Sequence, residues 1–187
     1  MTTLAAPPET KLVTGEELLA MGDIGPCELI DGRIVYMGPV GGEHGNLEFD
    51  LGRWLGNFVA DRRLGWVMGG EVGVYTRRNP DRVRGADIAF VSRKRLARRP
   101  PKGFLEVVPE LIVEVISPND VWEEIREKLE DYFSIGVERV WVVEPKNHTV
   151  LVYRSATEAA RLSEEDTLKG EGVLEGFALP VKQLFEE

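Results

Sequence analysis

Two acidic residues stand inside otherwise apolar segments of the sequence. Asp87 interrupts the run Gly85-Ala-Asp-Ile-Ala-Phe-Val91, and Glu114 interrupts the run Leu111-Ile-Val-Glu-Val-Ile116. An ionised carboxylate in such a segment loses its hydration and needs a cation or hydrogen-bond donors in return. If the two carboxylates converge, they also repel each other and raise each other's pKa.

A divalent cation would remove both penalties, because Mg²⁺ takes oxygen ligands from one or two carboxylates together with waters and a phosphate. A metal held in this way polarises a phosphoryl oxygen and lowers the pKa of bound water. This is the apparatus for hydrolysing a phosphodiester. The structural alternative is that Asp87 and Glu114 each pair with a buried Lys or Arg.

Both acids lie on segments that predict strands. The continuous aliphatic run at 111–116 suits a strand buried on both faces, and Pro109 and Pro118 mark its ends. A helix at about 121–135 and a strand at 139–144 follow. This order predicts a strand–helix–strand unit with parallel strands and a right-handed crossover. Residues 149–154 predict an antiparallel partner.

Other elements follow from periodicity and end signals. A long helix is predicted at about 43–63, where Leu47, Leu51, Leu55 and Phe58 recur at helical spacing. Asp120 and Glu123 predict a capping box for the helix at 121–135. Further expectations are a helix at 14–21 with a Thr14–Glu17 capping box, a hairpin turning at Asp31-Gly32, strands at 66–68 and 72–76 around Gly69-Gly70, a weak strand at 160–163 and a terminal helix at 179–185.

Length and composition predict one soluble globular domain over residues 1–187, with a loose lead-in at 1–12. The chain has 187 residues, of which 43% are hydrophobic and 29% charged. No apolar run approaches the roughly 20 residues that span a bilayer, and the N-terminus lacks a signal-peptide pattern. The single Cys27 fits a reducing cytoplasm. Two His and one Cys argue against a Cys/His zinc site.

The charge is unevenly distributed. The net charge of −9 argues against a protein that coats nucleic acid, yet residues 77–102 hold ten Lys and Arg against two Asp, a net charge of +8. A local basic field can still attract a polyanion. The predicted phosphate contacts are Arg77, Arg78, Arg84, Arg95, Arg98 and Arg99. The alternatives are a solvated loop or a subunit contact.

Several ordered motifs resemble the Uma-two family of restriction endonucleases, in the PD-(D/E)xK superfamily. They are Val83–Val91, Pro109–Asp120, Lys128–Tyr132, Gly136-Val137 and Trp141–Pro145, and the resemblance covers roughly residues 25–155. It implies an α/β (α+β mixed), restriction-endonuclease-like core with a central mixed β-sheet flanked by helices and an N-terminal β-hairpin. It also implies a Mg²⁺- or Mn²⁺-dependent endonuclease that hydrolyses DNA and works as a dimer or higher oligomer.

The resemblance carries over to particular residues. Asp87, Glu114 and the main-chain carbonyl of Val115 would hold the metal. The Glu-x-Lys element of the superfamily is interrupted, because Ile116 stands where the Lys would be, and in related members the following helix supplies this Lys. Lys128 matches that position. At 100° per residue it lies at the margin of the sheet-facing stripe, from which its ammonium can reach the strand ends.

Other candidates keep two interpretations. A literal Glu-x-Lys occurs at Glu144-Pro-Lys146, where Pro145 predicts a hairpin turn. Glu28 would join the metal shell. His44 is either a base or phosphate contact, or a helix-capping or solvent-exposed residue. Tyr132 is predicted to be a core residue. The alternatives to a nuclease are a non-catalytic nucleic-acid-binding or regulatory module on the same fold, and a hydrolase of small phosphoesters.

Overall fold

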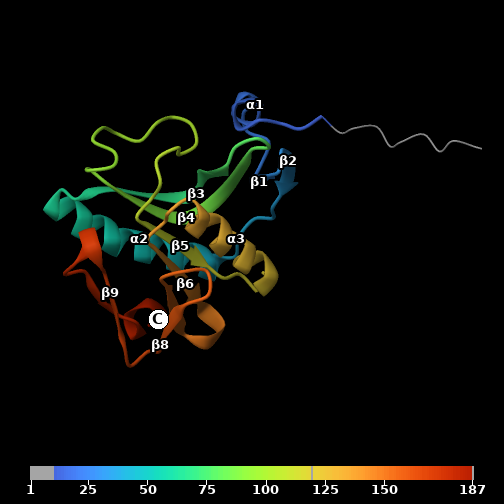
Figure 1. Cartoon of the computed structure of the whole chain (residues 1–187). Helices are drawn as coiled ribbons and strands as arrows, with labels where there is room; N and C mark the ends of the chain where they lie inside the picture. Colours follow the sequence, from blue (N-terminus) through green and yellow to red (C-terminus); the bar gives the residue numbers. More distant parts are fainter. Residues whose placement is uncertain (1–10, 119, 187) are drawn as a thin grey trace, which may run out of the picture.

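The computed structural model describes residues 11–118 and 120–186. Its centre is an eight-stranded mixed sheet (Figure 1). Seven strands follow in the order β2 (Arg33–Tyr36), β1 (Cys27–Ile30), β4 (Arg82–Ser92), β5 (Leu111–Val115), β6 (Arg139–Glu144), β7 (Thr149–Tyr153) and β8 (Ala159–Leu162), and β3 (Gly65–Arg77) pairs with β4. The β5–β6 pair is parallel and the other pairs of this sheet are antiparallel.

Two long helices cover opposite faces of the sheet. Leu47, Leu51 and Leu55 of α2 (Gly42–Arg62) pack with Val113 of β5, whereas Leu129 of α3 (Trp122–Ser134) packs with Ile112 of β5. Since successive strand residues point to opposite faces, α2 and α3 lie on the two sides. The C-terminal elements β9 (Thr167–Lys169), η2 (Gly172–Leu174), β10 (Ala178–Pro180) and α4 (Lys182–Phe185) join the core on the α2 side.

Several local predictions are confirmed. Thr14 and Glu17 form the predicted capping box of α1 (Gly15–Ala20). The β1–β2 hairpin turns at Asp31 (φ 53°) and Gly32 (φ 73°), as an Asp-Gly type I′ turn requires. The unit β5–α3–β6 has the predicted parallel strands. Glu144-Pro-Lys146 leads from the end of β6 into the short helix η1 (Pro145–Asn147), which confirms the predicted turn. The predicted lead-in at 1–12 lies mostly outside the described residues.

Three boundary predictions are wrong. Val121, not Asp120, is the N-cap of α3, because the Asp120 carboxylate accepts the Ser117 N–H at 2.7 Å and closes the preceding turn instead. The strands predicted around Gly69-Gly70 are one strand, β3, because a bulge absorbs the glycines. The terminal helix is only α4, because residues 178–180 pair with β9 and bury Leu179.

β1 and β5 pair with the same edge of β4 at different positions, and the segment of β4 between them has no strand partner on that edge. Leu29 of β1 pairs with Val83, and β5 pairs with Ile88–Phe90. Between these two ladders, side chains bind the backbone of Gly85. Its N–H donates to Glu28 Oε1 at 2.9 Å, and its carbonyl accepts from Lys128 Nζ at 3.1 Å and from the Tyr132 hydroxyl at 3.2 Å. Ionisable groups therefore gather at this interruption.

Candidate active site

Glu114 lies on β5 and is bound through both carboxylate oxygens. Lys128 Nζ donates to Oε2 at 2.8 Å, and the Tyr132 hydroxyl donates to Oε1 at 2.6 Å. Both partners come from α3, four residues apart, so they lie on one side of the helix. The Lys128 ammonium thus reaches the strand that carries Glu114, as the helical geometry predicted.

Burial governs the ionisation of this pair. It raises the pKa of Glu114 to about 8, with Lys128 opposing the rise and Asp87 adding to it. For Lys128, burial alone would lower the pKa, but the carboxylates of Glu114 and Glu28 outweigh it and raise the pKa. The site therefore favours a positive charge next to Glu114, either the ammonium or a cation.

Asp87 lies on the neighbouring strand, β4, and one of its carboxylate oxygens accepts a main-chain hydrogen bond. Its Oδ2 accepts the main-chain N–H of Val115 at 2.6 Å. The antiparallel register pairs Ile88 with Val113, and its continuation places Asp87 opposite Glu114. Asp87 is 3% exposed and Glu114 4% exposed, so water does not compensate either charge fully.

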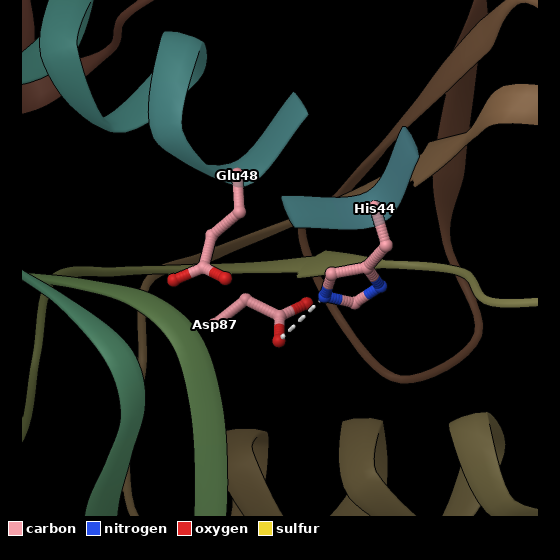
Figure 2. A group of neighbouring side chains, drawn as sticks. All are labelled: His44, Glu48 and Asp87. Carbon is pink, nitrogen blue, oxygen red and sulfur yellow. Dashed lines mark ion pairs between the residues drawn. The ribbon is translucent and has the colours of Figure 1, made fainter. Parts of the chain in front are cut away.

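His44 and Glu48 approach Asp87 from α2, as Figure 2 shows. One ligand atom of each of the three residues lies within 4.8 Å of those of the other two. His44 Nε2 is 3.3 Å from Asp87 Oδ1, and its Nδ1 lies 2.9 Å from Ser117 Oγ. The adjacent Asp87 raises the pKa of His44, whereas burial raises the pKa of Glu48, which also accepts the Gly70 N–H at 2.7 Å.

Glu71 is a further acid at this site. It sits in the β3 bulge with φ 57°, a left-handed conformation that is uncommon for a residue other than glycine. Its carboxylate lies so close to Gly85 that a Cβ at position 85 would force it to move. Burial, with repulsion from Asp87, raises the pKa of Glu71 to about 7. The bulge therefore places one more carboxylate over the interrupted ladder.

Glu28, the predicted accessory metal ligand, is engaged by protein groups. Its Oε2 accepts from Arg84 at 2.8 Å, and its Oε1 accepts the Gly85 N–H and lies 3.5 Å from Lys128 Nζ. Arg84 also donates to Asp131 at 2.6 Å. These contacts occupy both oxygens of Glu28 and place its carboxylate beside Lys128.

Four of the six predicted phosphate-contacting arginines are paired within the chain. Arg77 pairs with Asp31, Arg95 with Glu110 and Glu138, and Arg78 with Glu16, Asp81 and Glu106. Arg84 is 5% exposed and lies inside the site. Arg98 and Arg99 are exposed, and neither forms an ion pair with a described residue. Of the six predicted arginines, Arg98 and Arg99 are therefore the two that remain available to contact phosphate.

A groove of about 590 Å³ lies beside the cluster, between α2 and β3. It is lined in part by Glu48, Phe49 and Arg53 of α2 and by Gly69 and Gly70 of β3. The Phe49 side chain is 68% exposed. A ligand lying in this groove would contact Glu48 directly.

The sequence interpretation missed Glu48, Glu71 and the role of Tyr132. Glu48 follows His44 by four residues, which puts both on one side of a helix. Tyr132 stands in the same relation to Lys128. Gly69-Gly70 inside a strand pattern indicates a bulge, and this was the available signal for Glu71. The sequence shows the spacing of these residues along each helix or strand, but it does not show which side chains of different elements contact each other.

The fold is restriction-endonuclease-like. A family model for Uma2, described as "Putative restriction endonuclease", matches residues 16–182, and the chain belongs to this family. The crystal structure of a putative nuclease belonging to DUF820, from Anabaena variabilis ATCC 29413, is similar with a TM-score of 0.78 and 20% identity, over 92% of this chain and 97% of that chain. No curated protein matches. None of the described helices is long and apolar enough to cross a membrane.

The described residues fit the divalent metal that nucleases of this kind use. Asp87, Glu48 and Glu114 supply carboxylate oxygens, the donors that hard cations prefer. His44 Nε2 is buried and makes no hydrogen bond to the part of the chain that the structure describes. A divalent cation would relieve the mutual repulsion of these acids.

Proposed function

We propose that this protein is a Mg²⁺- or Mn²⁺-dependent endonuclease that hydrolyses phosphodiester bonds of DNA. The observation that carries the proposal is the meeting of Asp87 and Glu114 on adjacent strands with Lys128 bound to Glu114. Lys128 compensates the charge of Glu114, whereas Asp87 forms no ion pair with a described Lys or Arg, and a bound cation would compensate its charge. Family membership adds support, because Uma2 is described as a family of restriction endonucleases.

Each residue has a proposed role. Asp87, Glu114 and the Val115 carbonyl would hold the metal, which when bound would polarise the scissile phosphate and acidify a water. Lys128 would orient the attacking water and offset the charge that develops on phosphate oxygens. Tyr132 and Glu28 keep the ammonium and the Glu114 carboxylate in place through their contacts.

Cleavage of plasmid DNA by the metal-loaded protein tests the proposal. Asp87→Asn and Glu114→Gln should abolish Mg²⁺- and Mn²⁺-dependent cleavage. Glu144→Gln is the matched control, since Glu144 belongs to the other Glu-x-Lys sequence and ends β6 at a turn. Full cleavage by both site variants would assign the activity to another site or a contaminant.

A DNA-binding module without cleavage is the second candidate. The observation that favours it is Ile116, which stands where the superfamily pattern has its Lys, so that the Glu-x-Lys element after Glu114 is incomplete. Such a module would bind DNA without requiring a metal at Asp87 and Glu114. DNA binding without DNA cleavage, in the presence of Mg²⁺ and of Mn²⁺, would support this second candidate. A dimeric or higher assembly is part of the nuclease proposal and is tested by the mass of the protein in solution.

A further inference from the structure

Asp131 of α3 joins two arginines of β4. Its Oδ1 accepts from Arg82 Nη1 at 2.6 Å, and its Oδ2 accepts from Arg84 Nε at 2.6 Å. The Asp131 side chain is 14% exposed, so these ion pairs are largely shielded from water. Asp131 also follows Lys128 by three residues, which puts both side chains on one side of the helix. The proposed catalytic lysine therefore shares its helix face with a carboxylate that binds β4.

Arg84 continues this chain of contacts into the protein. While Nε is held by Asp131, Nη1 donates to Glu28 Oε2 at 2.8 Å. A guanidinium stays charged at every ordinary pH, and a buried charge needs carboxylate partners. The third nitrogen, Nη2, lies 3.5 Å from the exposed Glu127 and makes no hydrogen bond to the described part of the chain. Asp131 and Glu28 are therefore the two acids that set the position of Arg84.

Glu28 is shared between two cations. Its Oε2 accepts from Arg84, whereas its Oε1 lies 3.5 Å from Lys128 Nζ. The same ammonium is closer to Glu114, to which it donates at 2.8 Å. Because Asp131 supplies a second negative charge to Arg84, the charge of Glu28 also remains available to Lys128. Without Asp131, both cations would depend on Glu28, and their mutual repulsion would be less compensated.

We infer that Asp131 is a positioning residue for Lys128, which keeps the ammonium on Glu114 by holding and neutralising Arg84. The inference rests on the role proposed for Lys128 in DNA cleavage. The guanidinium is a rigid fork, whereas a lysine ammonium stands on a flexible four-carbon stem. When the negative charge of Asp131 is lost, Lys128 is therefore the cation that moves away.

Asp131→Asn tests the inference, because Asn keeps the size of the side chain and removes its charge. The kcat of DNA cleavage at saturating Mg²⁺ should fall by up to about 10²-fold, the effect of displacing a catalytic group by about 1 Å. The KM for DNA should stay the same. In a Lys128→Met background the same substitution should cause no further loss, since residues that act as a unit are not additive. A loss that persists in that background would mark a merely structural role and overturn the inference.

Glu130→Gln is the matched control for these measurements. Glu130 is the preceding residue of α3, is exposed and forms no ion pair with a described residue. The variant removes the same charge and should cleave like the parent. Asp131→Gln is a second neutral variant with a higher helix propensity, to be used where Asp131→Asn does not fold.

The reactivity of the Lys128 amine tests the inference in the metal-free chain without any assay of cleavage. Its side chain is 16% exposed and its ammonium is bound by Glu114 and Gly85, so acetic anhydride should acetylate it slowly in the parent and in Glu130→Gln. Acetylation, followed by peptide mass spectrometry, should be several-fold faster in Asp131→Asn, and Asp131→Glu should restore the slow rate.

The two readouts separate this inference from the nuclease proposal. Faster acetylation of Lys128 in Asp131→Asn, in a protein whose parent form does not cleave DNA, would support the positioning by Asp131 and count against the nuclease proposal alone. An unchanged acetylation rate in a folded neutral variant would overturn the inference, whatever the parent cleaves.

Discussion

The Lys128 ammonium lies 2.8 Å from Glu114 Oε2, although the two residues come from a helix and from the strand before it. In the superfamily pattern, the Lys stands two residues after the Glu on the same strand, where this chain has Ile116. The contact therefore gives the carboxylate a cationic partner by a different route through the fold.

Lys128→Met should reduce DNA cleavage by about 10²–10⁴-fold, the range that a positioned proton-transfer or water-orienting group contributes. The variant keeps most of the apolar stem and removes only the charge. Lys146→Met, at an exposed position of the other Glu-x-Lys sequence, is the control and should cleave normally. The initial rate of plasmid nicking at saturating Mg²⁺ measures the effect, and a rate equal to the parent's would refute a role for Lys128.

Tyr132→Phe should destabilise the metal-free protein by about 1–3 kcal/mol, because a buried oxygen of Glu114 loses its donor. The free energy of unfolding in urea, with EDTA present, measures this loss. Tyr153→Phe removes a hydroxyl with no hydrogen bond to a described residue and should change the stability much less. Equal stability of the two variants would show that the Tyr132 hydroxyl contributes nothing.

Glu71→Gln should make the metal-free protein relatively more stable as the pH rises. The pKa of Glu71 is about 7 in the folded chain against an ordinary value of 4.5, so the folded state keeps a proton that the unfolded state releases. This stabilisation is complete below pH 4.5 and is lost as the pH rises through 7. The difference in unfolding free energy between variant and parent should therefore grow between these values and level off above them.

Parallel urea titrations from pH 4.5 to 8 test this expectation. Glu43→Gln, an exposed acid of α2, should show no comparable trend. Glu71 is an exposed residue, but its carboxylate is turned against Gly85, so the size of the trend reports how well solvent screens that carboxylate. A difference that stays constant with pH would show that Glu71 titrates normally.

Replacing Arg98 and Arg99 with Ser should lower the salt dependence of DNA binding. Each lost phosphate contact reduces the slope of log K against log salt by about 0.9 for duplex DNA. Fluorescence anisotropy at several salt concentrations gives the slope. The control replaces the exposed Arg161 and Lys169, which removes the same charge from β8 and β9. Equal slopes for the two double variants would exclude a specific role for Arg98 and Arg99.

The sequence was sufficient to predict the framework of the site. Aliphatic runs around Asp87 and Glu114 located two buried strands, and the spacing to the next helix indicated the parallel crossover and the reach of Lys128. These features depend on periodicity along a single element, which can be seen without coordinates.

The α2 side of the site could not be predicted in the same way. His44 was given a general role and Glu48 none, because their meeting with Asp87 depends on how α2 lies across the sheet. The prediction that six arginines contact phosphate met a related difficulty. Their positive charge was evident in the sequence, but the acids that neutralise Arg77, Arg78 and Arg95 come from distant segments.

Between the end of the β1 pairing and the start of the β5 pairing, one edge of β4 is open to side chains from both faces of the sheet. Elsewhere the strands separate the α2 side from the α3 side, but beside Gly85 and Asp87 groups from both sides reach the same strand. Substitutions at His44 and Lys128 should then be thermodynamically coupled, although the helices that carry them lie on opposite faces. The two layers that flank the sheet behave here as a single electrostatic unit.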